Sequence, residues 1–61
     1  MRPTVSFESS NIWRRLQSCE IVAHAHGWHP NDIINFVQEV EEAFSYEEAM
    51  AVIEREFNVA C

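Results

Sequence analysis

Apolar side chains recur at helical spacing along three stretches of the chain, at about residues 11–26, 30–44 and 46–57. The middle stretch shows this most clearly, because its apolar residues follow the i, i+3, i+4, i+7 spacing of one helix face. They are Ile33, Phe36, Val37, Val40 and Phe44. The pattern predicts an all-α protein, a single small domain over residues 1–61 in which three helices follow an extended N-terminal arm.

The boundaries of the first helix carry recognisable signals. Ser9, Ser10 and Asn11 are each able to cap its N-terminus. Gly27 suits the left-handed position that follows a helix, where Trp28 would pack back on the last turn. Because the next helix follows almost at once, the first two helices are expected to form a hairpin or a sharp corner.

The third helix is also marked at both ends. Ser45-Tyr46-Glu47-Glu48 matches the capping box, in which Ser45 accepts a hydrogen bond from the Glu48 N–H and the Glu48 side chain reaches back to Ser45. Asn58 predicts a left-handed stop after the helix. At the other end of the chain, residues 4–7 alternate polar and apolar side chains. That alternation is compatible with a short edge strand, or with an arm laid along the helices or a partner.

The apolar faces of the three predicted helices together define an expected core. Its members come from one face of each helix: Leu16, Ile33, Phe36, Val37, Val40, Phe44, Ile53 and Phe57. A 61-residue chain leaves much of its surface wet, so this core is expected to be marginal.

Charge is distributed unevenly along the chain, which has four arginines, no lysine and ten acidic residues. Residues 1–30 carry three arginines against two glutamates, and residues 31–61 carry one arginine against eight acidic residues. Binding to phosphates requires clustered cations, so we expect no direct nucleic-acid binding. The acidic half suits a basic protein partner, or simply keeps a small domain in solution.

Metal binding is not predicted. Cys19, His24, His26 and His29 are the only cluster of potential ligands, and they lack the close paired spacing typical of a zinc site. Cys19 falls in the apolar face of the first helix, where it is expected to be an unreactive core thiol. We therefore expect neither a metal nor another cofactor.

Enzyme activity is not predicted either. The adjacent carboxylates at 41–42 and 47–48 lie on polar helix faces, where no pocket would separate their pKa values. The chain has one glycine, so it has no glycine-rich phosphate loop. It also lacks a signal-peptide pattern, a disulfide framework and any run of 18 apolar residues. These features predict a cytoplasmic protein with reduced thiols and no membrane association.

Apolar residues at the margins of the helix faces suggest an interaction surface, since a small three-helix unit has only one interior. With two carboxylates of the acidic half, the candidate interaction residues are Trp13, Trp28, Ile34, Glu41, Glu48 and Val52. Tryptophan is the residue most enriched at interaction hot spots. Alternatively, Trp28 is a lid on the corner between the first two helices and Trp13 packs under the arm. The surplus of apolar surface predicts a homodimer or higher homo-oligomer.

In overall character this short, acidic, helical chain, which opens Met1-Arg2-Pro3-Thr4-Val5-Ser6-Phe7 without a targeting signal, resembles the small early-region accessory proteins of lambdoid bacteriophages. The resemblance is one of type over the whole chain. It implies a non-enzymatic protein that binds host or phage proteins in the host cytoplasm and modulates host physiology. The alternative is an acidic mimic of nucleic acid that inhibits a DNA- or RNA-binding protein by occupying its basic groove. Salt should separate the two, because a mimic's affinity depends steeply on ionic strength.

Overall fold

The computed structural model describes residues 2–60 and contains three helices and two short strands. In chain order these are β1 (Thr4–Ser6), α1 (Ile12–Ala25), α2 (Pro30–Glu41), α3 (Tyr46–Glu56) and β2 (Asn58–Ala60). The three predicted helices are confirmed, although α2 ends three residues before Phe44.

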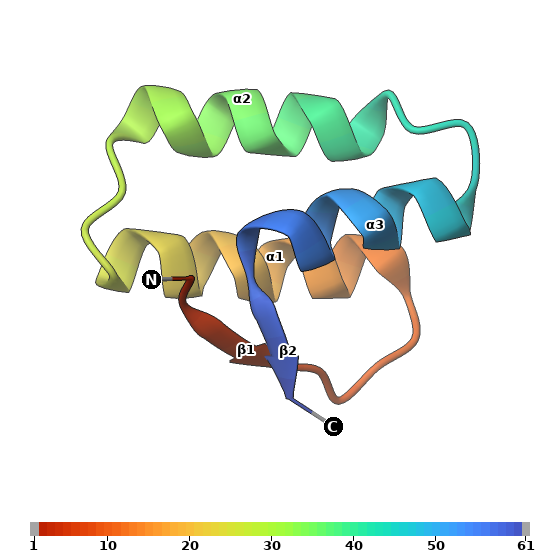
Figure 1. Ribbon diagram of the computed structural model, residues 1–61, viewed down its shortest axis with the longest axis horizontal. Coiled ribbons are helices and arrows are strands. Elements are labelled where there is room, and N and C mark those ends of the chain that lie inside the picture. The colour runs from red at the N-terminus through yellow and green to blue at the C-terminus, as the bar shows by residue number, and fades with distance from the viewer. Residues whose placement is uncertain (1, 61) are drawn as a thin grey trace.

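The elements form three layers (Figure 1). α1 and α2 run antiparallel, and α2 packs against both α1 and α3. The two strands lie on the other side of these helices, where β1 contacts α1 and β2 contacts α3. Both ends of the described chain therefore lie on the side away from α2 (Figure 1).

The strands correct the expectation of an all-α protein. β1 and β2 pair in parallel, with Val5 opposite Val59, so the N-terminal arm is an edge strand rather than a free extension. Val5 is only 2% exposed and anchors the arm in the core. Asn58 begins β2 and its N–H donates to the Pro3 carbonyl oxygen at 2.8 Å. The predicted left-handed stop at Asn58 is wrong, since Gly27 is the only residue in the 2–60 range with a positive φ.

The end of α1 confirms the glycine stop. Gly27 has φ of 87° and its N–H donates to the His24 carbonyl oxygen at 3.1 Å. The Trp28 N–H donates to the Ala23 carbonyl oxygen at 3.0 Å. Together these two bonds make a Schellman motif, which satisfies carbonyls that the helix leaves without partners.

The helix starts are capped by side chains. Asn11 is the cap of α1, and its Oδ1 accepts from the Trp13 N–H at 2.9 Å. His29 caps α2, with Nδ1 accepting from the Asn31 N–H at 3.1 Å. Each cap satisfies an N–H group that has no partner within its helix.

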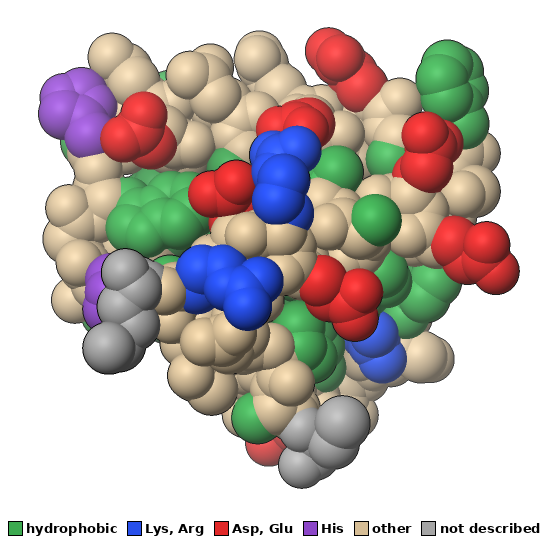
Figure 2. Space-filling model, viewed as in Figure 1, with side chains coloured by type: hydrophobic (Ala, Val, Ile, Leu, Met, Phe, Trp, Pro, Cys, Tyr) green, Lys and Arg blue, Asp and Glu red, His purple; other side chains and the backbone are tan. Residues whose placement is uncertain are grey.

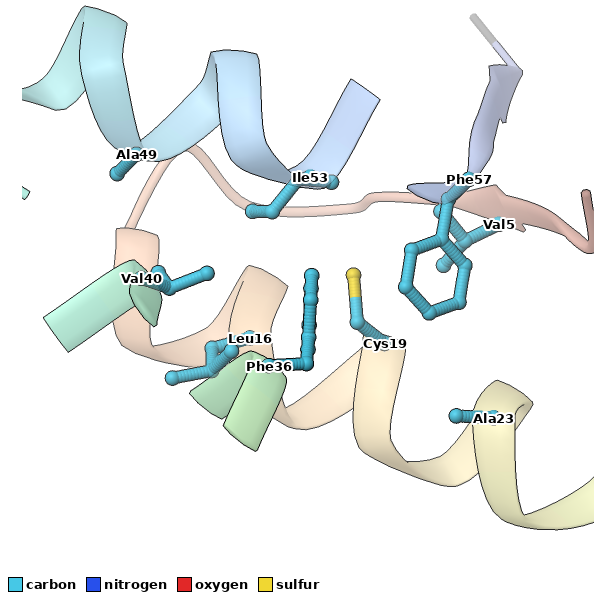
Figure 3. Packing of buried hydrophobic residues seen from close by; sticks show 9 residues of the cluster. All are labelled: Val5, Leu16, Cys19, Ala23, Phe36, Val40, Ala49, Ile53 and Phe57. Carbon is cyan, nitrogen blue, oxygen red and sulfur yellow. The ribbon is translucent and has the colours of Figure 1, made fainter. Parts of the chain in front are cut away.

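The hydrophobic core draws on all three helices, on β1 and on the residue before β2 (Figure 3). Its buried members are Val5, Leu16, Cys19, Ala23, Phe36, Val40, Ala49, Ile53 and Phe57. Five of the eight predicted core residues are thus confirmed, while Ile33 and Val37 are half-buried at its edge. Fully burying a side chain the size of Phe57 contributes about 1.5 to 3 kcal/mol. The prediction for Phe44 is wrong, because its side chain is 96% exposed.

Candidate functional site

The connection between α2 and α3, residues 42–45, carries an exposed aromatic side chain, Phe44. α2 stops at Glu41 and Glu42 is its C-cap. Two carboxylates at the negative end of a helix dipole oppose its extension. The chain therefore leaves the helix one turn before the predicted end, and the apolar spacing no longer directs Phe44 inward.

Two hydrogen bonds between side-chain oxygens and backbone N–H groups hold this connection in place. Ser45 caps α3, and its Oγ accepts from the Glu48 N–H at 3.1 Å, as the capping box predicts. The Glu48 carboxylate was predicted to reach back to Ser45, but its Oε2 accepts instead from the N–H of the preceding residue, Phe44, at 3.0 Å. Phe44 therefore lies at the surface on a backbone that this hydrogen bond holds in place.

Three aromatic residues, which we call the aromatic surface, line one hollow here: Trp13, Phe44 and Tyr46. The exposed fractions of Trp13 and Tyr46 are 59% and 45%. The hollow has a volume of about 280 Å³. Its walls come from the first turn of α1, the end of α2 and the start of α3, so three separate segments converge on it.

Arg15, on α1, contacts the aromatic surface at Tyr46. Its guanidinium carbon lies 5.7 Å from the centre of the Tyr46 ring and 5.0 Å from that of Phe7. Its Nε donates to the Ser9 carbonyl oxygen at 2.8 Å, which fixes the side chain. A cation at this distance from an aromatic ring is attracted by the electrons of the ring face. Arg15 therefore helps to set the position of Tyr46.

Acidic side chains surround the aromatic surface. The segment 41–48 contains four glutamates and no arginine or lysine, and Glu41 lines the hollow itself. Figure 2 shows carboxylates next to exposed apolar side chains on the side where α2 ends and α3 begins. The hollow is therefore mainly apolar inside, and we call two carboxylates its acidic rim: Glu41, which lines it, and Glu48, which accepts from the Phe44 N–H beside it.

The six predicted interaction residues do not form one site. Trp13, Glu41 and Glu48 lie at or beside the hollow, the last through its bond to Phe44. Ile34 is 54% exposed elsewhere on α2, and Val52 is half-buried in a groove between α2 and α3.

Trp28 is partly buried: it packs against the core and also lines a hollow of about 580 Å³ with Phe36, Glu39 and Arg55. Its ring stacks on Phe57 with centroids 5.3 Å apart and meets Phe36 edge-on at 5.9 Å. It therefore closes the corner between α1 and α2, which is the second of the two roles considered from the sequence. Trp13, in contrast, does not pack under the arm, since it lines the hollow on another side of α1.

Phe44 and Tyr46 are the site residues that sequence reasoning missed. Phe44 was predicted as a core residue, and the spacing of Tyr46, Ala49, Ile53 and Phe57 predicts that Tyr46 lies on the apolar face of the third helix. The available signal was local: two glutamates where α2 should continue, followed directly by the Ser45 cap of the next helix. A cap residue adopts an extended backbone, so the residue before Ser45 cannot lie inside a continuous helix.

The surroundings of Cys19 and Glu39 shift the pKa values of their side chains. Cys19 is fully buried, and desolvation, aided by the nearby charge of Glu20, raises the pKa of its thiol to about 12. Arg55 donates to both carboxylate oxygens of Glu39 at 2.7 Å and lies 3.0 Å from Glu56. The hydrogen bonds from Arg55 lower the pKa of Glu39. Within residues 2–60 no group of three His, Cys, Asp or Glu side chains is arranged to hold a metal ion.

Neither the length nor the apolar character needed to cross a membrane is found in any helix of the described chain. Comparison with protein-family models, with curated proteins and with solved structures gave no match. The geometry of the aromatic surface therefore carries the functional assignment.

Proposed function

We propose that this protein is a non-enzymatic interaction module that binds a protein partner in the cytoplasm through the aromatic surface. The observation that carries the proposal is Phe44, an aromatic side chain 96% exposed beside Trp13 and Tyr46 at one hollow. A partner of this kind fits the resemblance to phage accessory proteins, which implies binding to host or phage proteins.

Two physical properties support binding at this place. Aromatic side chains have large contact area and few rotatable bonds, so they lose little entropy when a partner covers them. The hydrogen bond from Phe44 to Glu48 and the contact of Arg15 with Tyr46 also hold the surface before binding. Preorganisation of this kind lowers the free-energy cost of association.

The test is quantitative affinity capture from a bacterial lysate with the wild type, Phe44→Ser and Ile21→Ser. Ile21→Ser is the control for the separate face that we assign to self-association below, because Ile21 is 68% exposed on α1 and does not line the hollow. The account predicts a protein that the wild type and Ile21→Ser enrich and Phe44→Ser loses. Equal enrichment by all three would contradict a role for the aromatic surface.

Self-association is a second part of the proposal, and it uses a different face. α1 and α2 run antiparallel, and each carries one isoleucine that is more than half exposed, Ile21 on α1 and Ile34 on α2. Two copies paired through this α1–α2 face would bury the same residues on each copy. The repulsion between two chains of net charge −6 would weaken as salt is added, so dimerisation should strengthen. Sedimentation equilibrium showing only monomer at every salt concentration would contradict this part.

The acidic mimic of nucleic acid is the alternative function, and the carboxylates on α2 and α3 favour it (Figure 2). A mimic would bind a basic groove with an affinity that falls steeply with salt. Replacing Phe44 would change that affinity little. The same capture experiment at two salt concentrations therefore separates the two functions.

A further inference from the structure

We infer that the occupant of the aromatic surface is a basic segment of another protein that places one apolar side chain in the hollow and its lysines or arginines against the acidic rim. This inference rests on the proposed function and adds the chemistry of the partner. The apolar lining of the hollow and the charge of its rim carry it.

The lining of the hollow requires an apolar anchor. Val40 and Ala49 belong to the buried core and also line the hollow, so it reaches down to the core. Ile12 and Ala43 add apolar walls. A polar side chain placed there would lose water without gaining hydrogen bonds to these side chains, which costs free energy. An aliphatic or aromatic side chain would instead remove apolar surface from water.

The rim requires positive charge on the partner. The negative charge of segment 41–48 has no cation within the segment; Glu41 lines the hollow, and Glu48 accepts from the Phe44 N–H beside it. Three of the four arginines have partners in this structure: Arg55 is held by Glu39 and Glu56, and Arg2 donates to the Glu54 carbonyl oxygen at 2.7 Å. The third, Arg15, is held by the Ser9 carbonyl oxygen and lies over the Tyr46 ring. Complementary charge across an interface speeds encounter and fixes its orientation.

The aromatic rings add a second attraction for cations. The indole of Trp13 is more than half exposed, and a lysine or arginine over an exposed aromatic face is attracted by the electrons of that face. Trp13 therefore offers a ring face to a partner whose charges also meet the glutamates, whereas the Tyr46 ring already contacts Arg15.

A second copy of this chain fits the hollow poorly. Pairing two aromatic surfaces would bring together the four glutamates of segment 41–48 from each copy. Like charges placed opposite one another at an interface are destabilising. The α1–α2 face does not have this problem, so self-association and partner binding are assigned to separate faces.

Two synthetic peptides of equal length test the inference. Both carry leucine at i, i+3, i+4 and i+7, with lysine at all other positions in one peptide and glutamate in the other. Isothermal titration measures affinity, and the fluorescence of Trp13 reports contact at the hollow. We expect the lysine peptide to bind and the glutamate peptide not to bind. We also expect Phe44→Ser to weaken the lysine peptide about tenfold, as for a hot-spot residue.

Charge-matched variants test the role of the rim. The double variant Glu41→Gln and Glu48→Gln, in which the glutamine oxygen at position 48 can still accept from the Phe44 N–H, should weaken the lysine peptide about tenfold and flatten its salt dependence. The control double variant Glu8→Gln and Glu54→Gln removes the same charge away from the hollow, so its affinity should stay within about twofold. Equal losses in the two double variants would show attraction to net charge alone and would overturn the inference.

Three other results would overturn it: no binding of the lysine peptide, equal binding of the two peptides, or an affinity unchanged by Phe44→Ser. A dimer that Phe44→Ser converts to monomer would identify a second copy as the occupant and would also overturn it. In each case the proposed function is judged separately, because capture from the lysate tests the dependence on Phe44 without assuming the chemistry of the partner.

Discussion

The two connections between helices differ in what they do with one large aromatic residue. Residues 26–29 turn Trp28 inward onto Phe36 and Phe57, whereas residues 42–45 leave Phe44 almost wholly in water. Both connections are four residues long and both are held by defined hydrogen bonds. The difference therefore does not arise from a loose second connection.

The backbone explains the difference. At the first connection the Schellman bonds reverse the chain within two residues and carry Trp28 back over the last turn of α1. At the second connection, the side chains of Ser45 and Glu48 bond the backbone on the α3 side. An aromatic residue that caps a core is explained by folding, while one that the chain holds in water calls for a partner.

The largest expected effect comes from truncating the two aromatic residues in parallel. Trp28→Ala should lower the free energy of unfolding by about 3 kcal/mol, because it removes a ring that packs on two core phenylalanines. Phe44→Ala should change it by no more than about 0.5 kcal/mol, as for an exposed residue. Urea unfolding followed by circular dichroism measures both. A similar loss in the two variants would remove the contrast between the connections.

The next effect concerns the glycine of the first connection. Gly27→Ala should destabilise the protein by about 1 to 2 kcal/mol, because an L-residue is strained at a φ of 87°. No atom lies within 4 Å of the added Cβ, so the cost comes from the backbone alone. Gly27→Asn should cost less, since asparagine tolerates the left-handed region. Thermal melting of the two variants checks the order, and an increase in stability for alanine would contradict the turn.

A smaller effect is expected at the second connection. Ser45→Ala removes the side-chain acceptor for the Glu48 N–H and should cost about 1 kcal/mol. If the cap also sets the position of Phe44, this variant should weaken partner binding as well. Ser45→Asn, which retains a capping side chain, should restore both properties. Binding that is lost in both variants would assign Ser45 a direct contact instead.

The smallest change is read from the reactivity of Cys19. Burial raises the pKa of its thiol to about 12, so iodoacetamide should label it slowly in the folded protein. Trp28→Ala should speed labelling by opening the core, and Phe44→Ala should not. Site-resolved mass spectrometry gives the rates.

The raised pKa of Cys19 also makes the free energy of unfolding depend on pH. Because the folded pKa lies above the ordinary 9.0, the contribution of the Cys19 thiol to stability is full below pH 9 and falls as the pH rises towards 12.

Local signals predicted much of the fold and little of its long-range pairing. The Gly27 turn, the Ser45 cap and the core positions Leu16, Phe36 and Ile53 follow from residues a few positions apart, which is where helix periodicity and capping act. The pairing of β1 with β2 joins residues more than fifty positions apart, such as Val5 and Val59. Three-residue strands carry too little pattern to predict such a partner.

The candidate site was predicted only in part for a related reason. Trp13, Glu41 and Glu48 were identified because their apolar or charged character stands out along the sequence. Phe44 and Tyr46 fit the helix periodicity as core residues, and only the early end of α2 places Phe44 outside. Helix ends depend on the dipole and on capping competition over one or two residues, so periodicity alone does not fix them.

The central claim is that Phe44 faces a protein partner. Photo-crosslinking in bacterial cells tests it most directly, with p-benzoylphenylalanine replacing Phe44 in one experiment and Ile21 in another. The account predicts that position 44 crosslinks to one other protein, and that position 21 crosslinks only to a second copy of this chain. Position 44 giving no crosslink, or the same crosslinks as position 21, would contradict the claim.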